Sequence, residues 1–465
     1  MAEPALPLGV NIAGYFDATL GVGESARNIA DALEAAGVAV TRLSLSSRAH
    51  PSEEAIAVAA GSATHPITIV CANPDGMTGA RDELGPAAFD GQHVIGLWWW
   101  EVPAIPERWL RAFDLVDEVW AGSRFVADVF SAVAPVPVVH VPMPVPEPVS
   151  SHKDRLHLGL PADAFLFGFA YDYASVAARK NPLGLIEAFG RAFPASDDSG
   201  VGLVLKTLGG ELRADEHAPV LAAAAAHPGV HVIDEHLTVA DKNALIGALD
   251  CYVSLHRSEG FGLTIAEAML LGVPVIASDY GGSRDLATPF NALLVDTRPV
   301  LIGPGSDPYP ATGEWAEPDL DHAAAQMRAA HVDPTAAAAR AARARADVRS
   351  RHSPAAAGRA MADRLARVLK HPLDASGLSA ALDLHAVRER MQIGPKAAPG
   401  AARGARGALR EAALRAMRPH TVHQRLVDEE ILRALQSLDE RVRGLAAGQQ
   451  TLAAELARLR RENGN

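Results

Sequence analysis

The sequence predicts an α/β protein with two Rossmann-like domains that face a cleft, followed by a C-terminal coiled-coil helix. In each of two successive segments, short apolar runs alternate with amphipathic stretches, which is typical of parallel sheets covered by helices. A proline-dense segment separates these two patterns, and the end of the chain repeats apolar residues with a heptad period. The predicted units are two domains, 1–150 and 151–373, a linker over 374–425 and a coiled coil over 426–465.

The composition indicates a soluble, multidomain protein of the cytoplasm. The chain has 465 residues, a length that suggests two or three domains. Hydrophobic residues make up 49% of it, which is enough to build buried cores. Its 43 lysines and arginines against 55 aspartates and glutamates give a net charge of -12, which argues against a nucleic-acid partner. The two cysteines, Cys71 and Cys251, cannot build a disulfide framework or a cysteine zinc site. We find no signal-peptide pattern and no apolar run long enough to span a membrane.

The first domain is predicted from six apolar runs. These runs lack a clean two-residue alternation, which suits strands that are buried on both faces of a parallel sheet. We expect helices at Glu24–Ala36 and Arg124–Val133. The predicted strands are Gly9–Tyr15, Val38–Leu45, Ile67–Ala72, His93–Trp99, Glu118–Ala121 and Pro137–Val141.

The second domain repeats this pattern after the proline-dense segment Pro135–Val149, because closely spaced prolines stiffen an extended connector and break strand pairing. The predicted strands are Phe165–Ala170, Gly202–Lys206, His231–Ile233, Cys251–Leu255, Val273–Ala277 and Ala292–Val295. The predicted helices are Pro182–Phe193, Arg213–Ala226, Val239–Leu249 and Leu263–Leu271. Open α/β sheets bind ligands beyond the carboxyl ends of their strands, so we expect the functional site in the cleft between the two domains.

The most informative stretch is Ser254–Leu286, SLHRSEGFGLTIAEAMLLGVPVIASDYGGSRDL. A strand is predicted to end at Leu255, a glycine-bearing loop holds Glu259, and a helix beginning near Leu263 carries Glu267. Glycines allow close approach by a ligand, and a helix N-terminus offers free N–H groups to a phosphate. Carboxylates only accept hydrogen bonds, so their natural partners here are sugar and ribose hydroxyls. The pattern therefore indicates a sugar that carries a diphosphate and a nucleoside.

This stretch resembles the E-x7-E region of retaining glycosyltransferases with the two-domain GT-B fold, and more narrowly the family 4 type, glycosyl transferases group 1. The resemblance includes the EGFGL loop, the EAM helix start and the GVPVIAS strand. It implies that Glu267 binds the nucleotide ribose and that Glu259 contacts hydroxyls of the donor sugar. It also implies that the backbone at Gly262 and Leu263 lies against the diphosphate or the sugar. No metal and no cofactor is expected beyond the nucleotide-diphosphate sugar, which is a co-substrate.

A second element, Ala177–Phe193, carries cations for this chemistry. Lys180 resembles the family's lysine that contacts the donor diphosphate, and as a loop-side lysine it is expected to bury little. The arginine that the family places five residues earlier is replaced by Ser175, so Arg179 is a candidate for the missing charge. Lys206, at the end of a predicted strand, is a further candidate. For each cation the alternative is an inert, solvated side chain.

Two elements of the first domain are candidates for the cleft. Gly21 and Gly23 lie in a loop before a helix, and the resemblance places such a loop near the reacting sugar; the alternative is a tight structural turn. Glu101 follows three tryptophans in a segment that resembles a W-x-W-E-x-P motif, which makes it an acceptor-side candidate or a loop anchor. The tryptophans are expected to divide between core and cleft. His140 is predicted to be a packed strand histidine, and Asp319-Leu320-Asp321 a solvated turn instead of a metal site.

The residues after Leu373 form two further segments. The Ala-, Gly- and Arg-rich residues 374–425 are either a solvated linker or a peripheral contact with an anionic membrane, which would bring the protein to the inner membrane face. The heptads over 426–465 predict a homo-oligomer, most simply a parallel dimer; a trimer and a helix packed on the catalytic body are the alternatives. The heptad positions are Ile431, Leu435, Leu438, Val442, Leu445, Gln449, Leu452, Leu456 and Leu459.

The resemblance, together with these features, implies a retaining, metal-independent hexosyltransferase. It would move a sugar from a nucleotide-diphosphate sugar to a glycan, a glycolipid or another hydroxyl acceptor in polysaccharide biosynthesis. A sugar-nucleotide 2-epimerase and a non-catalytic sugar-nucleotide-binding scaffold are the alternatives. The block around Glu259 and Glu267 argues against the epimerase. Lys180 argues against the scaffold, whereas Ser175 keeps that alternative open.

Overall fold

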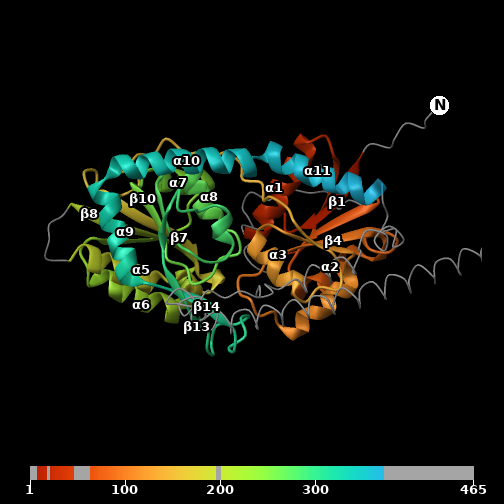
Figure 1. The fold of residues 1–465 in the computed structure, drawn as a ribbon, viewed down its shortest axis with the longest axis horizontal. Coiled ribbons are helices and arrows are strands. Elements are labelled where there is room, and N and C mark those ends of the chain that lie inside the picture. The colour runs from red at the N-terminus through yellow and green to blue at the C-terminus, as the bar shows by residue number, and fades with distance from the viewer. Residues whose placement is uncertain (1–7, 18–20, 47–62, 195–199, 371–465) are drawn as a thin grey trace, which may run out of the picture. The chain divides into compact units, whose positions relative to one another are not determined.

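The structure, a computed structural model, describes residues 8–17, 21–46, 63–194 and 200–370. Two six-stranded parallel sheets lie side by side in this part of the chain, each covered by helices (Figure 1). The predicted architecture of two Rossmann-like sheets is confirmed. The predicted linker over 374–425 and the coiled coil over 426–465 lie outside the described residues.

The first sheet has the strand order β2-β1-β3-β4-β5-β6. Every residue of β1 and β3 is buried, as expected for central strands covered on both faces, whereas β2 lies at an edge and is partly exposed. The strands are β1 (Gly9–Gly14), β2 (Ala39–Ser44), β3 (Ile67–Cys71), β4 (His93–Trp98), β5 (Glu118–Ala121) and β6 (Val138–His140). The helices between them are α1 (Gly21–Ala35), α2 (Met77–Leu84) and α3 (Arg124–Ser131), with 3-10 turns η1 (Pro74–Gly76), η2 (Pro86–Ala88) and η3 (Glu107–Leu115).

The second sheet has the strand order β12-β11-β10-β7-β8-β9. The strands are β7 (Phe165–Asp172), β8 (Val201–Leu208), β9 (Val230–Asp234), β10 (Cys251–Ser254), β11 (Val275–Ser278) and β12 (Leu293–Val295). The helices are α4 (Ala177–Lys180), α5 (Pro182–Ala192), α6 (Ala214–Ala225), α7 (Val239–Gly247) and α8 (Leu263–Leu271), with 3-10 turns η4 (Tyr173–Ser175), η5 (Gly210–Arg213) and η6 (Gly281–Asp285). The strand order reverses between β7 and β10, so the loops after these two strands meet at the point where open α/β sheets bind ligands.

An antiparallel hairpin that the sequence analysis did not predict follows the second sheet. It consists of β13 (Thr297–Leu301) and β14 (Glu314–Pro318). The helices α9 (Leu320–Val332), α10 (Pro334–His352) and α11 (Pro354–Lys370) come next. The solvated turn expected at Asp319–Asp321 is wrong, because the Asp319 carboxylate accepts hydrogen bonds from the N–H groups of Asp321 and His322 and caps α9.

The chain then returns to the first sheet through α11. Gly358 packs so closely on α1 that an added Cβ would lie 2.0 Å from the carbonyl oxygen of Ala32. The Arg364 guanidinium binds both carboxylate oxygens of the buried Glu118 on β5, and the Trp120 indole N–H donates to the same carboxylate at 2.6 Å. The helix that ends the second predicted domain is therefore anchored on the first sheet. The predicted boundaries at 150 and 373 stay predictions.

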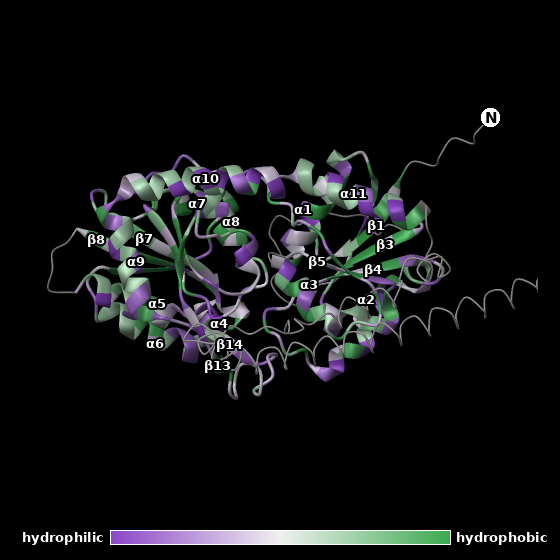
Figure 2. Cartoon of the chain, viewed as in Figure 1, coloured by the Kyte–Doolittle hydropathy of each residue, from purple (hydrophilic) through white to green (hydrophobic). Residues whose placement is uncertain are grey.

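Hydrophobic residues gather on the strands of both sheets, and the outer helix faces are hydrophilic (Figure 2). The three tryptophans divide as expected. Trp98 and Trp100 are buried in the core of the first half, whereas Trp99 is half-buried with its ring centroid 6.4 Å from that of Phe261 in the second half. None of the helices in the described ranges is both long and apolar enough to cross a membrane.

Candidate functional site

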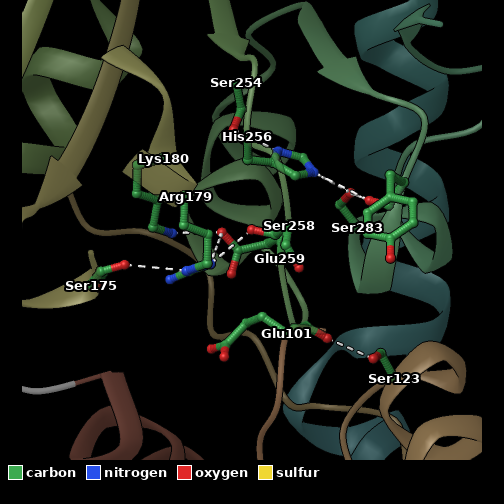
Figure 3. Close-up of polar contacts among 12 residues, drawn as sticks. Glu101, Ser123, Ser175, Arg179, Lys180, Ser254, His256, Ser258, Glu259 and Ser283 are labelled. Carbon is green, nitrogen blue, oxygen red and sulfur yellow. Dashed lines mark hydrogen bonds and ion pairs between the residues drawn. The ribbon is translucent and has the colours of Figure 1, made fainter. Parts of the chain in front are cut away.

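The loop after β10 carries Glu259 and is anchored by the buried His256. His256 is fully buried, and its Nε2 lies 3.2 Å from the carbonyl oxygen of Tyr280 and 3.1 Å from Ser283 Oγ. Because a carbonyl oxygen only accepts, Nε2 carries the proton and donates to Tyr280. Nδ1 then accepts from the Ser254 hydroxyl at 3.0 Å. These contacts fix the loop on the sheet (Figure 3).

Two glycines of the DYGG sequence allow η6 to approach this loop closely. The N–H of Gly282 donates to the carbonyl oxygen of Glu259 at 2.7 Å. A Cβ on Gly282 would lie 1.8 Å from the carbonyl oxygen of Gly260, which no real contact allows. Gly281 has a φ of +79°, in the left-handed region that favours glycine. The pair of glycines is therefore needed to shape the Glu259 loop.

The first half of the chain also contacts this loop. The Ser123 hydroxyl donates to the carbonyl oxygen of Gly260 at 2.6 Å, and its oxygen caps α3 by accepting from the Val126 N–H (Figure 3). The Arg124 N–H donates to the Asp285 carboxylate at 2.8 Å, and Nε2 of the half-buried His140 lies 3.5 Å from the same carboxylate. His140 thus belongs to the contact between the two halves.

Two cations meet the Glu259 carboxylate. Lys180 Nζ donates to Glu259 Oε2 at 2.6 Å, and Arg179 Nη1 lies 3.6 Å from the same oxygen. The side chains of Arg179, Lys180 and Glu259 are 4%, 14% and 14% exposed. Lys180 is therefore largely buried, and the expectation that it buries little is wrong. It is buried because Glu259, 79 residues further along the chain, reaches its ammonium.

The backbone around the two cations is held by unusual turns. Val176, before α4, and Asn181, after it, have φ values of 61° and 58°. Asparagine adopts such positive φ values more often than most residues, whereas the β-branched Val176 rarely does. Asn181 Oδ1 accepts from the Gly184 N–H at 3.2 Å and caps α5, while its Nδ2 donates to the Leu255 carbonyl oxygen at 3.0 Å. These contacts tie α4 to the loop after β10 and bring both cations to Glu259.

The Arg179 guanidinium is held by carbonyl groups as well as by charge. It donates to the carbonyl oxygens of Ser258 at 2.8 Å and Ser175 at 3.2 Å. Ser175, which stands where the family has an arginine, thus contributes its backbone to the placement of Arg179. Arg179 therefore stays the candidate for the charge that the resemblance places at position 175.

Electrostatics keep this cluster charged. Burial favours the neutral acid of Glu259, but Lys180 and Arg179 outweigh it and lower the pKa of Glu259 to about 2. Burial alone would lower the pKa of Arg179, but the surrounding Tyr309, Glu101 and Glu259 raise it. Burial lowers the pKa of Lys180 against the opposing pull of Glu259. Glu259 is an anion at neutral pH, and its 2.6 Å contact with Lys180 is an ion pair.

The second carboxylate, Glu267 on α8, has a partner that the sequence analysis missed. Lys242 Nζ, on α7, donates to Glu267 Oε1 at 2.6 Å, and the Glu267 side chain is only 7% exposed. Glu267 Oε2 is buried and has no hydrogen-bond partner in the described part of the chain. Burial raises the pKa of Glu267, Lys242 opposes this, and the nearby Glu24 raises it further. One carboxylate oxygen is therefore held by Lys242, and the other is buried without a partner among the described residues.

The first turn of α1 lies near this second carboxylate, and the loop expected at Gly21 and Gly23 is wrong, because both glycines are part of this helix. Helix α1 begins at Gly21, and Glu24 in its first turn acts electrostatically on both Glu267 and Lys242. Gly23 is buried, whereas a Cβ on Gly21 would meet no described atom within 4 Å. A side chain could therefore fit at Gly21, so the packing seen here does not require glycine at that position.

The remaining candidates lie in different places. Gly262 has a φ of +93° and precedes Leu263, the first residue of α8, so the backbone of both lies at the end of the Glu259 loop. Glu101 Oε2 accepts a hydrogen bond from the Tyr309 hydroxyl at 2.9 Å, which links the first half to the hairpin loop of the second. Lys206 is buried on β8, donates to the Thr207 carbonyl oxygen and has Asp234, Glu235 and Asp172 as its charged neighbours. Lys206 therefore belongs to a separate acidic cluster.

Lys242 and Tyr309 could not be predicted from the sequence, because each acts through a residue far away along the chain.

In the described ranges, no three His, Cys, Asp or Glu side chains come together as a metal site.

Comparison with known proteins finds a family that resembles part of the second half. Residues 173–301 match the family model of glycosyl transferases group 1. The matched segment is similar to the domain that this family model describes, and it contains Arg179, Lys180, Glu259 and Glu267.

One curated relative matches a short stretch. It is the lipopolysaccharide core biosynthesis mannosyltransferase LpsB of Rhizobium meliloti (strain 1021), 46% identical over 56 residues. The match spans 12% of this chain and only 15% of the length of that relative.

Solved structures show that the two sheets form the GT-B fold. HepE of Anabaena, in complex with UDP and glucose, matches with a TM-score of 0.56 and 17% identity over 77% of this chain and 99% of its own. Sucrose-phosphate synthase of Thermosynechococcus elongatus matches with a TM-score of 0.57 and 15% identity over 78% and 99%. A glycosyltransferase of Rickettsia africae ESF-5 matches with a TM-score of 0.57 and 13% identity over the same shares.

Proposed function

We propose that this protein is a retaining, metal-independent hexosyltransferase that uses a nucleotide-diphosphate sugar. The observation that carries the proposal is the meeting of Arg179 and Lys180 with Glu259 in the segment that matches the group 1 family, which also holds Glu267 with its unpartnered carboxylate oxygen. The acceptor would be a hydroxyl of a glycan, a glycolipid or a related molecule. The donor would bind mainly the second half and the acceptor mainly the first.

The two cations suit the departure of a nucleotide diphosphate. When the bond between the sugar C1 and the phosphate oxygen breaks, negative charge develops on that phosphate. A guanidinium and an ammonium fixed in a buried site stabilise this charge more than water does. The N–H groups at Gly262 and Leu263 open the nine-residue helix α8 and would add to this stabilisation. We propose that these groups do the work that a divalent ion does in other transferases.

The two carboxylates suit hydroxyl groups. Glu259, held as an anion, would accept hydrogen bonds from hydroxyls of the donor sugar, which would then lie next to the Lys180 ammonium. Glu267 Oε2 would accept from a ribose hydroxyl, while Lys242 keeps the other oxygen in place. A hydrogen bond to an ionised group contributes about 1.5–3 kcal/mol, which is enough to select a ligand that carries a ribose.

The transfer itself needs no protein nucleophile in this proposal. The acceptor oxygen would attack C1 from the face that the phosphate leaves, and its proton would pass to the departing phosphate oxygen. The configuration at C1 is then retained. The role of the protein is to orient both substrates and to exclude water, which would otherwise hydrolyse the donor.

The relatives suggest which donors to try first. HepE is described in complex with UDP and glucose, and LpsB is described as a mannosyltransferase, so UDP-glucose and GDP-mannose lead the panel. We further propose a cytoplasmic enzyme of polysaccharide biosynthesis. It would form a homo-oligomer, most simply a dimer, through the heptads of residues 426–465, and the basic side chains of 374–425 would contact the inner membrane face.

Nucleotide release from a panel of sugar nucleotides, with and without a mixture of hydroxyl acceptors, tests this function. A transferase releases nucleotide faster when an acceptor is present and forms a glycosylated product of retained anomeric configuration. A 2-epimerase changes the sugar or hydrolyses the donor without an acceptor, and a scaffold binds without turnover. Release that is indifferent to every acceptor would overturn the proposal.

A further inference from the structure

A pocket of about 560 Å³ opens between a loop of the first half and the hairpin of the second. It is lined by residues 105–108, which lead into η3, and by residues 303–311, which connect β13 to β14. Its volume falls within the range of about 300–1,000 Å³ that is usual for small-molecule sites. None of the site residues predicted from the sequence lines this pocket.

Tyr309 lines the pocket and joins it to the first half of the chain. Its side chain is buried, and its hydroxyl donates to Glu101 Oε2 at 2.9 Å. Its ring centroid lies 5.0 Å from that of Trp100, so both partners of the tyrosine come from the first half. Arg179 and Glu259 both act electrostatically on Tyr309. Tyr309 therefore joins the pocket to Glu101, and Glu101 borders the Glu259 loop, since an added Cβ on Gly260 would lie 3.7 Å from Glu101 Cγ.

The lining of the pocket defines the chemistry of its ligand. Its charged side chains are Glu107, Asp307 and Arg108, all exposed, so acceptors of hydrogen bonds outnumber cations. Much of the remaining wall is apolar and rigid, formed by the ring of Tyr309 and by four prolines at positions 106, 304, 308 and 310. Carboxylates bind hydroxyl donors and repel anions, whereas flat apolar faces suit the C–H surfaces of a sugar ring.

We propose that this pocket is the acceptor subsite and that it takes a neutral glycan, with Tyr309 as a positioning residue that fixes Glu101. The inference rests on the proposed function, since only a transferase needs a second sugar next to its donor. It assigns to the hairpin of the second half a role in acceptor binding. An acceptor seated here would meet the donor sugar on the side of the cluster that Glu101 and Tyr309 border.

A pocket-filling variant and a matched neighbour test this assignment in the full chain. Ala311→Trp puts a large side chain into the pocket from an exposed position, whereas Thr312→Trp puts the same side chain on an exposed residue that does not line it. Saturation-transfer NMR measures binding of methyl α-glucoside, methyl α-mannoside and maltose as neutral probes and of glucose 6-phosphate as an anionic probe. Donor hydrolysis without acceptor is measured in parallel.

We expect at least one neutral probe to bind the wild-type protein and the Thr312→Trp variant. Its signal should fall at least fivefold in Ala311→Trp, donor hydrolysis should be unchanged, and glucose 6-phosphate should bind more weakly. Equal binding by both variants, no binding of any neutral probe to the wild type, a stronger phosphorylated probe, or a parallel loss of donor hydrolysis would each overturn the pocket assignment. If no donor turns over at all, the proposed transferase fails, while the binding signals still decide whether this pocket holds a glycan.

Discussion

Removal of the Lys180 ammonium should destabilise the folded protein as well as its chemistry. Lys180 and Glu259 are each 14% exposed and 2.6 Å apart. Loss of one partner from a buried pair costs about 3–5 kcal/mol, because the other charge stays buried without compensation. Arg179, 3.6 Å from the same carboxylate oxygen, compensates part of this loss. For Lys180→Met we therefore expect a loss of about 3 kcal/mol, or roughly a 150-fold shift in the unfolding equilibrium.

Denaturant unfolding followed by circular dichroism and by tryptophan fluorescence measures this loss, provided that the two signals coincide. The matched control is Lys153→Met. This lysine pairs with Asp241 at 2.9 Å but is 46% exposed, so its removal should cost less than about 1 kcal/mol. The double variant Lys180→Met/Glu259→Gln removes both partners of the 2.6 Å pair and leaves Arg179 with its two carbonyl acceptors, so at least half of the lost stability should return. A Lys180→Met protein as stable as the Lys153→Met control, or losses that simply add in the double variant, would refute the buried ion pair.

Four further outcomes follow from the same structure. Glu267→Gln should weaken nucleotide binding about 10- to 150-fold by calorimetry with little effect on turnover at saturating donor, since its unpartnered oxygen is assigned to the ribose. Glu259→Gln should instead lower turnover at a nearly unchanged nucleotide affinity, and the opposite split in steady-state kinetics would reverse the two roles. Burial lowers the pKa of His256 from 6.5 to about 4, so the unfolded chain takes up this proton first and the unfolding free energy should fall by about 3 kcal/mol between pH 6.5 and 4. His256→Gln should flatten that slope in urea titrations, and an unchanged slope would show that other groups cause it. Light scattering should find an oligomer for the full chain and a monomer for a chain ending at Leu373. The same number of chains per particle in both proteins would contradict the coiled coil.

The two sheets could be predicted from the sequence because each strand is a short apolar run between turn signals. The predicted helix Leu263–Leu271 has the bounds of α8, since a glycine at each end marks where the helix starts and stops. The β13–β14 hairpin was missed because its prolines and glycines interrupt any alternation of apolar and polar residues. The helix start at Asp319 was missed for a similar reason, because an acidic, proline-flanked stretch is as typical of a turn as of an N-cap.

The candidate site could be predicted only in part. Glu259, Glu267 and Lys180 stand in motifs that the sequence displays directly. The pairing of Glu267 with Lys242 depends on how α7 packs beside α8, and the bond between Glu101 and Tyr309 joins residues 208 positions apart. Neither contact leaves a local pattern. For Lys206 the strand-end position could be predicted from the sequence, but its acidic neighbours Asp234 and Asp172 could not.

Binding of nucleoside diphosphates to the full chain tests the central claim most directly. In the proposed site, Arg179, Lys180 and Glu267 bind a nucleotide diphosphate. UDP, GDP and ADP are added in a thermal and denaturant unfolding series, with the matching nucleosides as controls. We expect one diphosphate to stabilise the fold by about 2.7 kcal/mol at 100 times its Kd, and its nucleoside to stabilise it far less. If none of the three stabilises the protein at millimolar concentration, or if a nucleoside does so as well as its diphosphate, the account of this site is contradicted.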